Sequence, residues 1–143
     1  MKHKNVLLID DEEDFAEALA KRLKARAFTV DIASRGVTAL EKVKERDYDA
    51  VLLDLAMPGW DGIETLKRLK EEKPNLQVIL LTGHATVSKS VEAMKLGAVD
   101  LVEKPAALDD LLEKIEAAME RKKDLREKLM EKNLSSILGT KGW

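Results

Sequence analysis

Cysteine is missing from all 143 residues of the chain. Disulfide bonds, thiolate catalysis and cysteine-ligated metal centres are therefore excluded, and nothing indicates an oxidising compartment. Long apolar runs are missing too, and no apolar stretch approaches the ~18 residues needed to span a membrane. The apolar run that follows Lys4 is too short for a secretory signal peptide. We therefore expect a cytoplasmic protein without membrane contact.

The chain also lacks a large excess of either charge. Its formal net charge is -2, and no basic patch stands out, whereas phosphate contacts in nucleic-acid binding need clustered lysine and arginine. We expect no direct contact with nucleic acid. Apolar residues make up 45% and charged residues 36%, a balance typical of a folded, helix-rich domain rather than a disordered chain.

Short apolar runs alternate with amphipathic stretches along the chain, which predicts parallel strands joined by crossover helices. The predicted strands are residues 6–9, 28–33, 50–55, 76–81 and 99–102. Most of these runs are continuously apolar, as expected of strands covered on both faces, but 28–33 alternates, which favours an edge position. The predicted fold class is therefore α/β, with a doubly wound five-stranded parallel sheet flanked by five helices in a flavodoxin-like three-layer sandwich.

One pair of residues and two single residues indicate where helices begin or end. Asp61 and Glu64 have the spacing of a capping box at the start of the third helix. Pro74 closes that helix, and Gly97 fits a left-handed cap after the fourth.

The composition changes near residue 120, so we assign residues 1–120 to one domain and residues 121–143 to a charged helical C-terminal extension. Residues with the 4-3 spacing of a coiled coil continue into this extension: Leu111, Ile115, Ala118, Lys122, Leu125, Leu129 and Lys132. Two interpretations stay open, a solvated helix that frays near Asn133 and a dimerising helix whose seam is weakened by its two lysines. The chain is expected to be a monomer or a weak homodimer.

Polar residues stand where the predicted strands end. Asp10 and Asp11 follow the first strand, Asp54 the third, Thr82 the fourth and Lys104 the fifth. In an open parallel sheet these ends converge on the ligand-binding edge. Gathered carboxylates favour a hard cation such as Mg²⁺, with Mn²⁺ as a second possibility, and such a site suits phosphoryl transfer to an aspartate. Each residue alone has a simpler explanation, such as a turn or helix cap, and the convergence is what favours a site.

Four motifs in this order resemble the receiver domain of two-component response regulators. They are Asp10-Asp11 after an apolar strand, DLAMPGWDG at 54–62, LTGH at 81–84 and Lys104-Pro105. The resemblance covers about residues 4–120. It implies a response regulator receiver domain that a sensor histidine kinase phosphorylates in a Mg²⁺-dependent phosphorelay, and that signals through protein contacts.

The resemblance also implies a role for each matching residue. Asp54 would be the phosphoacceptor, and it would share the Mg²⁺ ion with Asp11 as a direct ligand. Asp10 would act on the metal through water, and the carbonyl oxygen of Ala56 would be a further ligand.

Further residues would bind the phosphoryl group and report on it. Thr82 and Lys104 would each contact a phosphoryl oxygen, and the bond from Lys104 to Pro105 would be cis. Leu101 stands where the family usually has an aromatic side chain whose rotation couples to the threonine. We therefore expect a muted switch.

The implied output is a downstream protein effector, or an output domain if the chain is a piece of a longer protein. We expect no enzyme beyond self-phosphorylation and slow autodephosphorylation. Phosphatases with an aspartate nucleophile carry a second aspartate two residues further on, where this chain has Ala56. The alternative is a phosphorylation-independent, receiver-like interaction scaffold.

Overall fold

The computed structural model describes residues 4–57, 62–83, 87–104 and 107–139. Within these ranges the chain forms alternating strands and helices, as the apolar pattern predicted. No helix in the described ranges is both long enough and apolar enough to cross a membrane.

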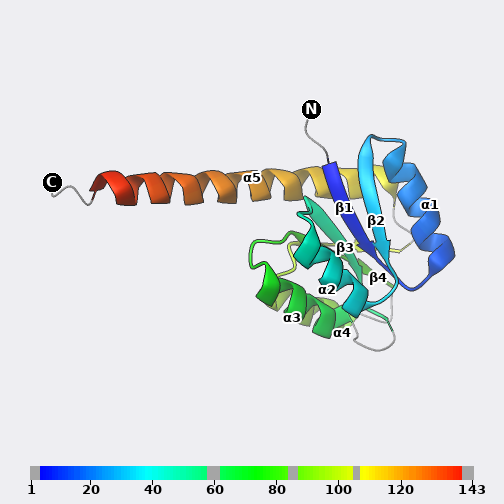
Figure 1. The fold of residues 1–143 in the computed structure, drawn as a ribbon. Helices are drawn as coiled ribbons and strands as arrows, with labels where there is room; N and C mark the ends of the chain where they lie inside the picture. Colours follow the sequence, from blue (N-terminus) through cyan, green and yellow to red (C-terminus); the bar gives the residue numbers. More distant parts are fainter. Residues whose placement is uncertain (1–3, 58–61, 84–86, 105–106, 140–143) are drawn as a thin grey trace.

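A parallel five-stranded sheet forms the middle layer (Figure 1). Its strands are β1 (Lys4–Ile9), β2 (Phe28–Ala33), β3 (Ala50–Asp54), β4 (Val78–Thr82) and β5 (Asp100–Glu103). They are ordered β2-β1-β3-β4-β5, so β2 lies at an edge, as its alternating sequence predicted. The predicted strand boundaries agree with the observed ones to within two residues, and those of β2 agree fully.

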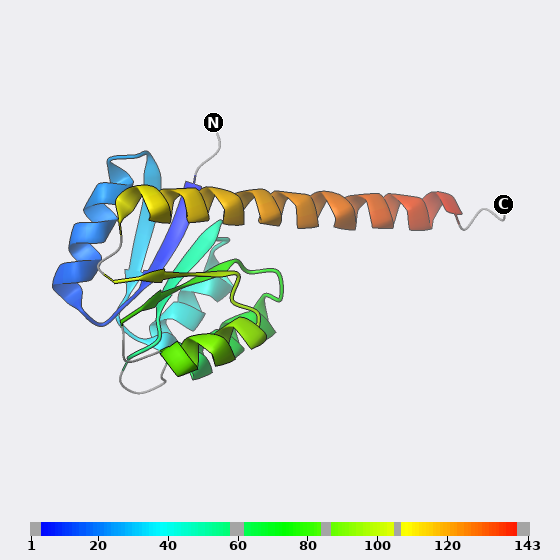
Figure 2. The same ribbon diagram turned by 180° about the vertical axis from the view of Figure 1, so that it is seen from behind.

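Five helices cover the two faces of the sheet. They are α1 (Glu13–Lys24), α2 (Gly36–Glu45), α3 (Gly62–Glu72), α4 (Val87–Lys95) and α5 (Leu108–Gly139). Seen from behind, α1 and α5 lie over one face, while α2, α3 and α4 lie over the other (Figure 2). The predicted doubly wound three-layer fold is confirmed.

Alternating residues of the inner strands β1, β3 and β4 supply two separate cores. In β1, Leu7 and Ile9 point to the core under α2, α3 and α4, whereas Val6 and Leu8 point to the core under α1 and α5. All four side chains are fully buried. Apolar transfer contributes about 25 cal/mol per Å² buried, so strands covered on both faces need continuous apolar sequence.

The start of α3 is pressed against the end of β3. The amide of Gly62 donates a 3.0 Å hydrogen bond to the carbonyl oxygen of Leu55. A Cβ atom on Gly62 would lie only 2.2 Å from the Cα of Leu55. Glycine is therefore required here by close approach of two backbones.

The helix-end predictions have different outcomes. Gly97 adopts φ = 110° after α4, so the left-handed cap is confirmed. Helix α3 ends at Glu72, two residues before Pro74, as predicted. The capping box cannot be assigned, because Asp61 lies outside the described residues.

Helix α5 is 32 residues long and projects well beyond the sheet (Figure 1). It continues to Gly139, so the predicted fraying near Asn133 is wrong. Beyond the sheet, large apolar side chains on α5 are exposed: Leu125, Leu129, Met130, Leu134 and Ile137. Whether this segment pairs with a second copy stays a prediction.

Lys122 faces the domain, although the 4-3 spacing placed it in a possible dimer seam. Its ammonium group donates a 2.8 Å hydrogen bond to the carbonyl oxygen of Tyr48. It also lies 3.1 Å from a carboxylate oxygen of Asp47 and 3.6 Å from one of Asp49. These contacts fasten α5 to the loop between α2 and β3.

Candidate functional site

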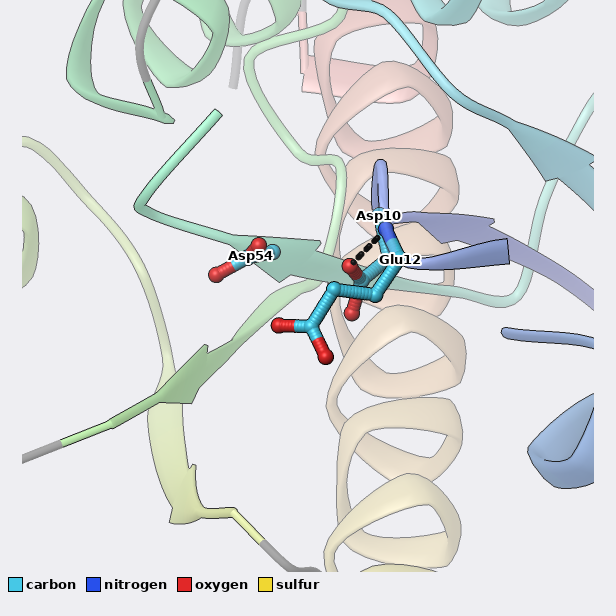
Figure 3. A group of neighbouring side chains, drawn as sticks. All are labelled: Asp10, Glu12 and Asp54. Atoms are coloured by element: carbon cyan, nitrogen blue, oxygen red, sulfur yellow. Dashed lines mark hydrogen bonds between the residues drawn. The ribbon is translucent and has the colours of Figure 1, made fainter. Parts of the chain in front are cut away.

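The carboxyl ends of the parallel strands bring the predicted polar residues to one edge of the sheet. Asp10 directly follows β1, Asp54 and Thr82 are the last residues of β3 and β4, and Lys104 directly follows β5. Figure 3 shows the carboxyl groups of Asp10, Glu12 and Asp54 gathered beside the ends of β1 and β3. The topology alone therefore produces a local concentration of charge.

Lys104 is the cation that faces this acidic group. Its ammonium nitrogen lies 2.8 Å from Asp10 Oδ2, 3.2 Å from Glu12 Oε1 and 3.6 Å from Asp54 Oδ2. The side chain is only 15% exposed. Burial alone would lower the pKa of Lys104, but the hydrogen bond to Asp10 and the charges of Asp10 and Asp54 outweigh it and raise the pKa. The lysine is therefore held firmly in its charged form.

Asp54 is almost completely buried, with 4% of its surface exposed. Its Oδ1 atom accepts a 3.1 Å hydrogen bond from the amide of Ala56, while Oδ2 faces Lys104. Burial raises the pKa of Asp54, and the charges of Asp10 and Asp11 add to that rise. The Ala56 amide and Lys104 act in the opposite direction without cancelling it. The ionised carboxylate is thus held in an unfavourable environment that added positive charge would relieve.

Asp10 is fully buried. Its Oδ1 atom accepts a 2.9 Å hydrogen bond from the amide of Glu12. Its Oδ2 atom lies 2.8 Å from the Lys104 ammonium nitrogen, in a charge-assisted contact. A carboxylate oxygen has more than one lone pair, so Oδ2 can also coordinate a cation beside Lys104.

Comparison with known proteins decides the family. A family model described as Response regulator receiver domain matches residues 6–116, most of the chain.

The chain belongs to the response regulator receiver domains.

Similar sequences occur in longer regulators. The transcriptional regulatory protein ZraR of Escherichia coli O157:H7 is 38% identical over 121 residues, covering 83% of this chain and 27% of that protein. A putative NtrX-like response regulator of Rickettsia typhi is 34% identical over 140 residues, covering 92% of this chain and 30% of that protein. The chain thus spans less than a third of the length of these relatives.

Solved structures of receiver domains share the fold. The receiver domain of NtrX from Brucella abortus superposes with a TM-score of 0.77 at 32% identity, covering 80% of this chain and 98% of that one. A response regulator receiver domain protein from Clostridium thermocellum superposes with a TM-score of 0.81 at 33% identity, covering 85% of this chain and 98% of that one. The flavodoxin-like receiver fold of this domain is therefore shown by sequence and structure together.

Within this receiver domain, the grouped acidic residues differ in one position from the set that the sequence suggested. Carboxylate oxygens of Asp10, Glu12 and Asp54 lie within 4.8 Å of one another. Asp11, the predicted direct ligand, is half-buried and its charge acts on Asp54, but its oxygens are not part of this group. Glu12 was missed, although the run of five acidic residues from Asp10 to Asp14 was a signal for it.

The other predicted site residues of the receiver domain have different outcomes. Thr82 is 4% exposed, and its carbonyl oxygen accepts a 2.7 Å hydrogen bond from the amide of Lys104. Ala56 is exposed beside Asp54. Leu101 lies on β5 with 36% of its surface exposed, outside both cores. Pro105 lies outside the described residues, so its predicted cis bond is untested.

The donor set of the receiver domain fits a hard divalent cation. The three grouped carboxylates supply only oxygen ligands, which suits Mg²⁺ or Mn²⁺ better than a softer metal. Together with Lys104 they carry a local charge of -3 + 1 = -2 when ionised. A divalent cation would balance that charge.

Proposed function

We propose that this receiver domain is a phosphorylation switch in which Asp54 accepts a phosphoryl group from a sensor histidine kinase. The observation that carries the proposal is the position of Lys104, whose ammonium nitrogen lies 3.6 Å from the buried carboxylate of Asp54. This arrangement pairs a nucleophilic carboxylate with a fixed positive charge in a site of low dielectric.

The transfer uses the residues of the pocket in distinct roles. A carboxylate oxygen of Asp54 attacks phosphorus, forming an aspartyl phosphate as the nitrogen–phosphorus bond of the donor histidine breaks. Lys104 offsets negative charge on the transferred group, and the hydroxyl of Thr82 donates a hydrogen bond to it. Bound Mg²⁺ supplies positive charge that lowers the cost of bringing phosphate oxygens to these carboxylates.

The metal-binding residues in this proposal are Asp10, Asp11, Asp54 and the carbonyl oxygen of Ala56. The burial of Asp10 and the place of its carboxylate in the acidic group support its inclusion. Glu12 is a further candidate, because its carboxylate lies within the same group.

The output of the switch is a change in protein contacts. We assign residues 1–120 to the receiver domain and residues 121–143 to an extension that connects it to a protein effector or to an output domain on a longer chain. Thr82 and Leu101 form the proposed route to the surface of α4, β5 and α5. Leu101 lacks a ring that could rotate, so the conformational change is expected to be small.

Labelling with acetyl phosphate tests the proposal. Wild-type protein incubated with acetyl phosphate and Mg²⁺ should gain the mass of one phosphoryl group, and Asp54→Asn should gain none. Asp124→Asn, a carboxylate on the exposed part of α5, is the matched control and should label like wild type. Equal labelling of Asp54→Asn and wild type would refute the acceptor. No labelling of wild type would instead favour the phosphorylation-independent scaffold.

A further inference from the structure

Lys104 has a partner in the structure besides the carboxylates. Its ammonium nitrogen lies over the ring of Phe15, 4.5 Å from the ring centroid. Phe15 is on α1, half-buried and packed against the core under α1 and α5. A cation at this distance from an aromatic face is attracted by the negative potential of the ring.

We propose that Phe15 is a positioning residue for phosphoryl transfer, acting by holding the Lys104 ammonium group beside Asp54. The proposal rests on the phosphorylation function proposed above. It adds an apolar residue, which acts on the site only through its contact with Lys104. Phe15 is one of only two phenylalanines in the chain.

The carboxylates hold Lys104 unevenly. Glu12 accepts a hydrogen bond from Lys104 at 3.2 Å, but its side chain is 64% exposed and free to carry the ammonium group toward solvent. Asp54, the proposed acceptor, is the most distant of the three at 3.6 Å. A long flexible lysine stem offers many rotamers in which this distance would increase.

The ring and the carboxylates respond differently to added positive charge. A divalent cation among the carboxylates would offset the charge that attracts Lys104 and would repel its ammonium group. The attraction of the ring does not depend on carboxylate charge, and Phe15 is anchored in a packed core. The ring should therefore contribute most to the position of Lys104 when a cation is bound to the carboxylates and the ammonium group contacts the phosphoryl oxygens.

Three variants separate this role from packing. Phe15→Leu keeps an apolar side chain but removes the aromatic face, whereas Phe15→Tyr keeps the face. Phe28→Leu is the matched control, because it removes a similar contact elsewhere. The ammonium nitrogen of Lys4 lies over the ring of Phe28, 5.4 Å from the ring centroid. Phe28 is buried in the same core and belongs to the opposite end of the sheet, where the strands begin.

Calorimetric titration with beryllofluoride, a phosphoryl analogue, at saturating Mg²⁺ gives the main readout. We expect Phe15→Leu to weaken beryllofluoride binding about fivefold, from the usual strength of a partly desolvated cation–π contact. Phe15→Tyr and Phe28→Leu should bind it within a factor of about two of wild type. Mg²⁺ affinity measured without beryllofluoride should be unchanged in all of them, because Phe15 offers no ligand atom.

A second readout reports on the contact itself. The ε-methylene protons of Lys104 should be shifted upfield by the ring current in wild type and Phe15→Tyr, and this shift should vanish in Phe15→Leu. If Phe15→Leu binds beryllofluoride as tightly as wild type, or if Phe28→Leu weakens it equally, the positioning role is refuted. If wild type itself fails to bind beryllofluoride, the phosphorylation proposal falls, while the methylene shift still tests the contact between Phe15 and Lys104.

Discussion

Replacing Gly62 by alanine should destabilise the domain strongly, because the new Cβ atom would meet backbone rather than a movable side chain. It would lie 2.2 Å from the Cα and 2.8 Å from the carbonyl oxygen of Leu55. Neither atom can rotate away, so α3 must move away from the end of β3. Overpacking of this kind costs about 3 kcal/mol, and the better helix propensity of alanine returns at most about 1 kcal/mol.

The expected net loss is about 2 kcal/mol, which corresponds to a fall in Tm of about 8 °C for a domain of this size. Urea denaturation followed by circular dichroism measures the loss directly. Leu55 is also the residue after Asp54, so displacement of its backbone should slow labelling by acetyl phosphate. The structural and functional effects share one cause and should appear together.

Gly83→Ala is the matched control, since a Cβ atom on Gly83 would meet no atom within 4 Å. It also directly follows a residue of the proposed site, Thr82, and should change the free energy of unfolding by less than about 0.5 kcal/mol. The reasoning is refuted if Gly62→Ala unfolds at the same urea concentration as wild type, or if both alanine variants are destabilised equally.

Three further predictions concern charged and polar groups. Asp54→Asn should raise Tm in metal-free buffer, by about 4 °C per kcal/mol, because it removes a buried charge whose pKa is raised by burial; calorimetry with a chelator would show a lower Tm if this is wrong. Lys122→Met should speed amide exchange in residues 121–139, whereas the exposed neighbour variant Lys123→Met should not; equal exchange in both would contradict the docking of α5. Burial and the 2.6 Å hydrogen bond to Asp31 raise the pKa of Tyr48, so its stabilising effect is complete below the usual tyrosine pKa of about 10 and is lost as pH rises beyond it. Phenolate absorbance of this single tyrosine should stay low in the folded chain at pH values where unfolded chain ionises, and a titration with an ordinary midpoint would disprove the shift.

The sheet and the central part of the site could be predicted because both depend on chain direction. Continuously apolar runs identify strands covered on both faces, and parallel strands necessarily end at the same edge. The neighbourhood of Asp10, Asp54 and Lys104 follows from those two facts. Distances between these residues did not need to be known in advance.

Which acidic residue joins that group could not be predicted, because it depends on the turn after β1. The amide of Glu12 bonds to the carboxylate of Asp10, and this bond fixes the path of the chain and brings the Glu12 side chain to Lys104. Asp11 and Glu12 are adjacent acidic residues, and their sequence does not distinguish the two outcomes. Lys104, the hydrogen-bond partner of Glu12, belongs to a segment about ninety residues further along the chain.

Which face of α5 packs against the domain also could not be predicted from the sequence. Its 4-3 spacing identifies one face of the helix, but the same spacing serves packing against the domain or against a second copy. At Lys122 the spacing serves packing against the domain, because Asp47 and Asp49, which lie in a loop, pair with its ammonium group. A helical pattern does not contain that information.

The contact between Lys122 and the domain also makes α5 a lever arm. From Lys122 to Gly139 the helix rises about 26 Å at 1.5 Å per residue, with no break in that length. A tilt of about 10° at the point of attachment would therefore carry the far end through about 4–5 Å. A tilt too small to rearrange the domain would therefore still be a large displacement at the far end of the helix.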